Sequence, residues 1–131
     1  MKTIKKIAII GVVVLMTSCS TTANFPISEV TPAADITASY EKQGASDYLV
    51  TITANNLADS ERLNPPKKYY IIWAVSSAGD IKNVGRFDQE NARISTYQAS
   101  FPFKPTEIFI TAEDKDDLRK PIGVEISRTK I

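Results

Sequence analysis

Short runs of β-branched and aromatic residues, separated by turn residues, dominate the chain from residue 33 onward. Apolar and polar residues alternate in most of these runs, as they do in strands that bury one face. In residues 48–54, for example, apolar residues take every second position. No segment of this region sustains a helical period. The pattern predicts seven strands, at residues 36–40, 48–54, 69–75, 81–87, 92–101, 107–112 and 123–131.

The run Tyr69–Val75 differs from the others because both of its faces are apolar. Such a strand is typical of a central position with each face covered. Gly85 predicts a distortion in the strand over residues 81–87, and Ile94 is expected to point inward from the strand over residues 92–101. Seven short strands with frequent turns predict an all-β fold, an antiparallel immunoglobulin-like β-sandwich, with a barrel as the main alternative.

The first 18 residues have the organisation of an export signal. Three lysines lie within the first six residues, and the ten residues Ile7–Met16 that follow are apolar without interruption. Ten apolar residues suit a signal peptide and are too few to span a bilayer, which takes about 20. The sequence Met16-Thr17-Ser18-Cys19 then resembles the bacterial lipobox, with Met16 in place of the usual leucine. This resemblance implies cleavage before Cys19 and fatty acylation, including palmitate, at that residue; an ordinary secretory signal or an uncleaved anchor is the alternative.

The predicted organisation has three parts: residues 1–18 as the lipoprotein signal peptide, residues 19–32 as the lipidated cysteine with a flexible tether, and residues 33–131 as the sandwich. The stretch from Ser20 to Pro32 is polar and shows neither period, and its full extension would span roughly 40 Å. The lipobox resemblance also implies a location in the cell envelope. An aspartate after the modified cysteine retains lipoproteins of this kind in the inner membrane, and Ser20 stands there instead, so we expect the outer membrane. The acidic cluster that resembles a surface-export signal is missing between Ser20 and Ile27, which favours the periplasmic face over the cell surface.

Composition excludes several classes of function. The part after residue 18 has 13 Lys and Arg against 15 Asp and Glu, a formal charge of −2 without a basic run, which argues against nucleic acid as a partner. The chain has no histidine and one cysteine, so the usual zinc sites and a Ser-His-Asp relay cannot be built. We therefore expect no enzymatic activity, no cofactor and no metal.

Two clusters of side chains have a functional and a structural interpretation. Trp73 with its neighbouring tyrosines is either a stacking platform for a ligand or a core residue, and the core is favoured. The carboxylates of Glu113, Asp114, Asp116 and Asp117 are either Ca²⁺ ligands or a solvated loop, and the interspersed basic residues favour the loop. Glu107 could join one of them as a glycosidase acid–base pair, but any charged β-protein offers such pairs.

The segment from Ala58 to Lys68 is the longest connection between predicted strands, and it combines charges of both signs with two adjacent prolines. Long, rigid loops on sandwiches often carry recognition. If one surface binds a partner, we expect it here rather than in a plain crossover. The candidate partner-binding residues are Arg62, Pro65, Pro66 and Lys67.

The order of landmarks from Leu49 to Ile126 resembles the extracytoplasmic domain of the anti-sigma-K factor family. The landmarks are residues 50–54 with Leu57, Pro65-Pro66, Tyr70 with Trp73, Gly79, Gly85-Arg86-Phe87, residues 110–113 and Pro121-Ile122-Gly123. The resemblance implies a β-sandwich outside the cytoplasm. The chain departs from the family because it has no sigma-binding region or membrane-spanning helix, and because residues 114–117 replace a glycine pair.

The sequence thus predicts a lipid-anchored, non-enzymatic β-sandwich of the cell envelope. Its expected partners are the membrane, through the lipid on Cys19, and another envelope protein. Two alternatives remain: an envelope-stress or signalling accessory module, which the family resemblance suggests, and a hydrolase of envelope polymers, which the missing catalytic motifs disfavour.

Overall fold

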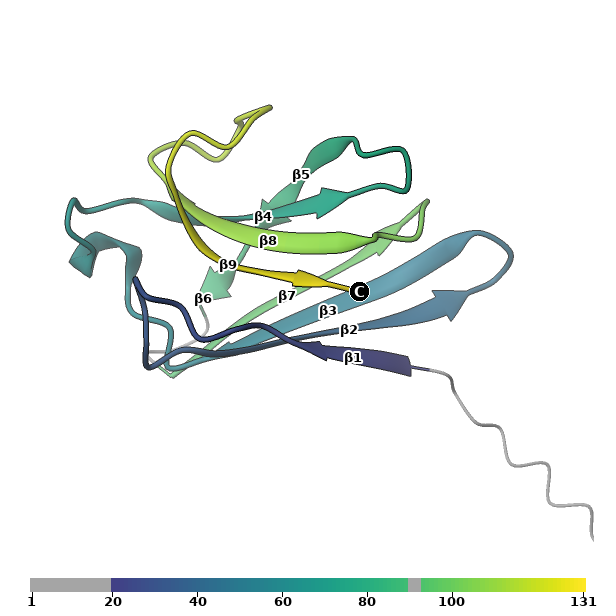
Figure 1. The fold of residues 1–131 in the computed structure, drawn as a ribbon, viewed down its shortest axis with the longest axis horizontal. Helices are drawn as coiled ribbons and strands as arrows, with labels where there is room; N and C mark the ends of the chain where they lie inside the picture. Colours follow the sequence, from purple (N-terminus) through teal and green to yellow (C-terminus); the bar gives the residue numbers. More distant parts are fainter. Residues whose placement is uncertain (1–19, 90–92) are drawn as a thin grey trace, which may run out of the picture.

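The computed structural model describes residues 20–89 and 93–131, which form two antiparallel sheets packed face to face (Figure 1). One sheet has the strand order β1-β2-β3-β7-β6 and the other β5-β4-β8-β9. The strands are β1 (Ser20–Asn24), β2 (Asp35–Gln43), β3 (Asp47–Asn55), β4 (Tyr69–Val75), β5 (Ile81–Arg86), β6 (Asp88–Gln89), β7 (Ile94–Phe101), β8 (Glu107–Glu113) and β9 (Val124–Lys130). The fold is a β-sandwich of two open sheets, as predicted, and not a closed barrel.

The strand order is that of an immunoglobulin domain with additions. In the constant type, strands A, B, E and D share one sheet and strands C, F and G the other. The first sheet matches the order A, B, E, D with the strands β2, β3, β7 and β6. The second sheet matches the order C, F, G with β4, β8 and β9. The strands β1 and β5 extend one edge of each sheet.

The main core lies between the sheets, where alternate residues of the facing strands meet. All seven predicted strands are present. The period-two alternation of each strand directs its apolar residues into the space between the sheets. The largest fully buried side chains between the sheets are Val50, Ile52, Ile72, Ile108 and Ile110.

The prediction that Ile94 points inward is wrong, because β7 has the opposite phase. Ile94 is 38% exposed, whereas Ser95 and Tyr97 are buried. The phase follows from Tyr97, whose ring packs against Gly85: a Cβ at that glycine would lie 2.9 Å from the ring. The Tyr97 hydroxyl also donates a hydrogen bond to the carbonyl of Val84 at 2.6 Å. The predicted distortion at Gly85 is confirmed, since the β4–β5 register shifts there.

The expected flexible tether is also corrected by the structure. Residues 20–24 form β1, which pairs with β2 from Ser20 opposite Glu41 to Asn24 opposite Thr37. Phe25 then joins the main core, and the hydroxyl of Ser127 on β9 donates to the Pro26 carbonyl at 2.8 Å. The segment forms a strand because its backbone groups pair with those of β2. A polar composition does not exclude such pairing. Residues 1–18 and Cys19 lie outside the described residues.

A second apolar cluster lies on the outer face of the four-stranded sheet. Ile71, Trp73 and Phe109 form it, with Leu118 from the following loop packed against them. The rings of Trp73 and Phe109 stack with centroids 6.1 Å apart. The prediction that β4 is central and covered on both faces is therefore confirmed. Trp73 is fully buried, as the core interpretation expected, but in this outer cluster rather than between the sheets.

Because the strands are antiparallel, their connections gather at the two ends of the sandwich (Figure 1). The loop end, on the left of the view, carries residues 25–34 and 56–68 and both ends of the 114–123 loop. The middle of that loop folds back over β5, where residues 119–121 line a hollow with residues 79–81. The turn end, on the right, carries residues 44–46, 76–80 and 102–106. The turn after β4 lies there and is closed by a hydrogen bond from the Ser76 amide to the Asp80 carbonyl at 2.9 Å.

Candidate functional site

The connection that carries the predicted partner-binding residues is fixed to the body of the sandwich. A short 3-10 helix at Ser60–Arg62 begins after Asp59, whose carboxylate accepts a hydrogen bond from the Glu61 amide at 3.1 Å. The carbonyl of Ser60 accepts the amide of Lys67 at 2.9 Å. Leu63 is buried in the main core. The connection therefore presents its side chains from a defined backbone.

A groove of about 490 Å³ lies at the loop end, between this connection and the start of β9. We call it the loop-end groove. Of the four predicted residues, Pro65 and Lys67 line it, whereas Arg62 and Pro66 are exposed and are not among its lining residues. The complete lining is Val30, Leu63, Asn64, Pro65, Lys67, Ile122, Gly123 and Val124.

The loop-end groove is apolar and open to solvent. Ile122 is 78% exposed, and Val124 and Val30 are also exposed on the same lining. A second hollow of about 250 Å³ adjoins it, because Lys67, Ile122 and Gly123 line both. Single exposed apolar residues are ordinary, but a contiguous set rimmed by polar groups is typical of a binding surface.

A buried carboxylate fixes one wall of the groove. Glu113, at the end of β8, is 2% exposed. Its Oε2 accepts the Ile122 amide at 3.1 Å and its Oε1 accepts the Gly123 amide at 2.5 Å. Charge-assisted hydrogen bonds of this kind are about twice as strong as neutral ones. The end of the 114–123 loop is thereby held against β8, and the side chain of Ile122 projects from this fixed backbone into solvent.

The same carboxylate continues a hydrogen-bonded chain into the outer cluster. The Thr111 hydroxyl donates to Glu113 Oε2 at 2.7 Å and accepts the indole N–H of Trp73 at 2.8 Å. Each buried polar group in this chain therefore has a partner. Trp73 presents no face to a ligand, and its indole instead supports the wall of the groove through two intervening side chains.

The acidic cluster at residues 113–117 does not act as one unit. Asp114, Asp116 and Asp117 are exposed, as the solvated-loop interpretation expected, but Glu113 is buried, which that interpretation did not expect. Asp114 pairs with Lys67 at 3.5 Å and Asp116 with Arg86 at 3.1 Å. Among residues 20–89 and 93–131, no three His, Cys, Asp or Glu side chains gather as a metal site would require.

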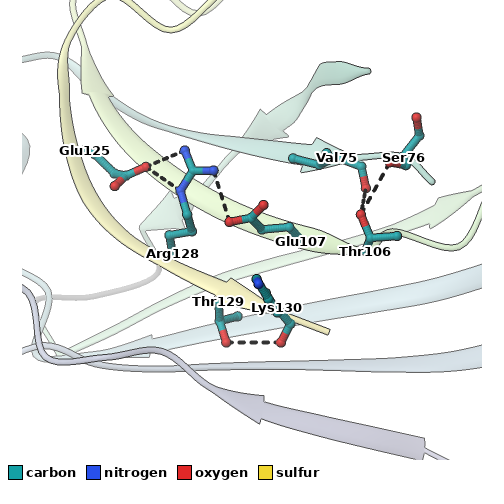
Figure 2. Close-up of polar contacts among 8 residues, drawn as sticks. All are labelled: Val75, Ser76, Thr106, Glu107, Glu125, Arg128, Thr129 and Lys130. Carbon is teal, nitrogen blue, oxygen red and sulfur yellow. Dashed lines mark hydrogen bonds and ion pairs between the residues drawn. The ribbon is translucent and has the colours of Figure 1, made fainter. Parts of the chain in front are cut away.

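Glu107 lies at the opposite end of β8 in an ion-pair network (Figure 2). The guanidinium of Arg128 donates to Glu107 at 3.0 Å and to Glu125 at 2.8 Å, and it lies 4.1 Å from the ring centre of Phe109. Burial opposes the charge of Arg128, but these hydrogen bonds outweigh it and raise its pKa. Glu107 is thus the ion-pair partner of the arginine that covers Phe109, and it lies at the other end of β8 from the carboxylates of residues 113–117.

Comparisons with protein-family models, with curated proteins and with solved structures find no match for this chain. None of the helical segments in the described part of the chain is both long and apolar enough to cross a bilayer.

Sequence reasoning missed the residues that make the groove a site. Ile122 appeared only as a landmark of the family resemblance, and Val124 only as part of the last predicted strand, without a functional role. A signal was present for Glu113, because residues 107, 109, 111 and 113 share one face of β8, and that face carries Phe109. Continuing the alternation places Glu113 beside the outer cluster.

Proposed function

We propose that this protein is a lipid-anchored β-sandwich of the bacterial cell envelope that binds another envelope protein in the loop-end groove, without catalysis. The exposed Ile122 on a wall clamped by the buried Glu113 carries the proposal. Because the backbone of Ile122 is already held in place, the loop loses little conformational freedom on binding, so the contact area of this residue contributes to affinity.

The chemistry of the groove defines the segment that would bind. Val30, Leu63, Pro65, Ile122 and Val124 surround the space with apolar surface. They suit an aliphatic or aromatic side chain, whose burial contributes about 1.5–3 kcal/mol. Well-filled pockets of this kind form the energetic centre of many interfaces.

The membrane attachment in this proposal rests on the leader and on Met16-Thr17-Ser18-Cys19. Two or three acyl chains on Cys19 would make dissociation from a bilayer negligible, because each buried methylene contributes about 0.8 kcal/mol. Ser20 in the following position supports the outer membrane, and the absence of acidic residues between Ser20 and Ile27 supports its periplasmic face.

The attachment is tested with Cys19→Ala in cells grown with labelled palmitate. We expect the label to be lost and the protein to leave the membrane fraction. Unchanged labelling would refute lipidation at Cys19.

Binding is tested by crosslinking membranes from cells that express the wild-type chain, Ile122→Ser or Ile27→Ser. Ile27 is the matched control, because it is 80% exposed and does not line the groove. We expect a specific envelope protein to be recovered with wild type and Ile27→Ser but to be lost with Ile122→Ser. Equal recovery with all three chains would refute the groove as the binding site.

The identity of the captured protein separates the alternatives. A structural envelope protein supports scaffolding, whereas a transmembrane regulator supports the signalling role that the anti-sigma-K resemblance suggests. Turnover of an envelope polymer by the purified protein would support the third alternative, a hydrolase of envelope polymers.

A further inference from the structure

The distance between the modified cysteine and the folded domain is set by a single peptide bond. Ser20 is the first residue of β1 and pairs with Glu41, and consecutive Cα atoms are about 3.8 Å apart. Residues 25–31 cannot lengthen the connection, because they are packed against the domain: Phe25 is in the main core, and Ser28 and Thr31 are buried. An acyl group on Cys19 would therefore hold the sandwich directly at the bilayer.

The direction of β1 determines which end of the sandwich meets the bilayer. Ser20 lies beside Glu41, near the β2–β3 turn, and β1 runs from there toward the loop end (Figure 1). The turn end is thus nearest to Cys19. The loop-end groove lies at the other end, beyond strands of seven to nine residues, which corresponds to roughly 25–30 Å.

The surface of the turn end suits lipid headgroups. Four exposed lysines lie there, Lys42, Lys82, Lys104 and Lys130. Lys82 Nζ lies 5.0 Å from the ring centre of Phe103, and Lys104 Nζ lies 5.6 Å from that of Tyr40. Lysines that rest on aromatic rings keep their ammonium groups in water while apolar surface stays covered, as at membrane interfaces.

The turn end has fewer free acidic side chains than lysines. Asp47 and Asp80 are exposed and Glu41 is half-buried, while Glu107 pairs with Arg128 (Figure 2). The lysines therefore outnumber the carboxylates that face the bilayer. Basic groups near an anionic membrane are attracted to it over about a Debye length.

We propose that the turn end is a membrane-contacting surface, in which these four lysines bind anionic phospholipid headgroups and hold the loop-end groove away from the bilayer. This inference rests on the lipid anchor of the proposed function. It assigns the domain a fixed orientation rather than a position at the end of a flexible arm.

The orientation is tested on the full lipidated protein in vesicles of phosphatidylglycerol and phosphatidylcholine that contain a headgroup-nitroxide lipid. The thiol of Cys19 is consumed by lipidation, so one introduced cysteine carries a fluorophore. We place it at Ala78 in the turn end, or at Glu61 in the loop end as the control; both positions are exposed. We expect strong quenching at Ala78 and little at Glu61.

Equal quenching at the two positions, or stronger quenching at Glu61, would overturn the orientation. The outcome is separable from the anchor, because flotation of the protein with the vesicles reports lipidation independently. Protein that fails to float refutes the anchor and with it the proposal made here.

The role of the lysines is tested by changing all four to Gln in the Ala78-labelled protein. We expect quenching to fall in phosphatidylglycerol vesicles toward the level seen in pure phosphatidylcholine. The matched control removes four charges from the loop end, with Arg62, Lys67, Lys68 and Lys115 changed to Gln, and should leave quenching unchanged. An equal fall in both variants, or in neither, would refute headgroup binding by the turn end.

Discussion

The carboxylate of Glu113 offers the sharpest test of how the groove wall is held. It accepts three hydrogen bonds inside a nearly closed site, from the Thr111 hydroxyl and from the amides of Ile122 and Gly123. Glu113→Gln keeps the shape of the side chain but replaces one acceptor oxygen by an NH₂ donor. In either orientation of the new amide, one backbone N–H of the 114–123 loop faces a donor.

The cost follows from that lost acceptor. A buried donor without a partner costs about 1–3 kcal/mol, so we expect the free energy of unfolding to fall by about 2 kcal/mol. In a domain of this size the midpoint of thermal unfolding should fall by about 8 °C. Urea unfolding should show a lower midpoint with an unchanged slope, because the surface exposed on unfolding is the same.

A control variant separates this effect from a simple change of charge. Glu107→Gln removes the same charge from the same strand, but its ion pair with Arg128 is partly exposed. Such pairs contribute about 1 kcal/mol or less. Hydrogen exchange of the Ile122 and Gly123 amides should accelerate in Glu113→Gln only. Equal stability of the two variants, with no change in exchange, would refute the clamp.

Three further predictions concern the rest of the sandwich. Trp73→Ala should cost about 3–5 kcal/mol in urea unfolding, since the residue is fully buried; a fully stable variant would contradict its role as a core residue. Gly123→Ala should cost about 3 kcal/mol, because a Cβ there would lie 1.9 Å from a backbone oxygen of β8. The control Gly44→Ala, at φ +66° with open space around it, should cost about 1 kcal/mol, and equal losses would argue against crowding. Burial raises the pKa of Tyr70 and Tyr97 from 10.0 to about 12, so the folded state favours the neutral phenols. Their contribution to stability is complete below pH 10 and is lost as the pH rises to about 12; urea unfolding with tyrosinate absorbance checks this, and constant stability over that range would contradict it.

The strands were predictable because their signal is local. The period-two pattern placed all seven expected strands, and the two-sided apolar run identified β4 as central. Neither β1 nor β6 was predicted. In β1 only Ala23 is partly buried among residues 21–24, so its pairing depends on backbone hydrogen bonds that leave no pattern of side chains. The two-residue β6 is too short to show a period.

The groove depended on information that the sequence does not carry locally. The prediction of a partner-binding connection included Pro65 and Lys67, which do line the groove, because prolines and mixed charges mark such loops. The opposite wall comes from residues more than fifty positions later in the chain. Ile122 is held at its exposed position by the carboxylate of Glu113. In the sequence, Glu113 cannot be told apart from the acidic residues of the loop that follows it. Side-chain chemistry alone did not indicate that it was buried.

The position of β1 has a mechanical consequence for a protein held at one end and loaded at the other. A pull between the anchor and a partner in the loop-end groove would run nearly parallel to the strands. The five residue pairs that join β1 to β2 would then bear the load in shear, all at once, instead of opening one after another. Resistance to such a force is set by the rate of unfolding under tension rather than by equilibrium stability. The first strand would therefore act as the load-bearing joint between the lipid and the fold.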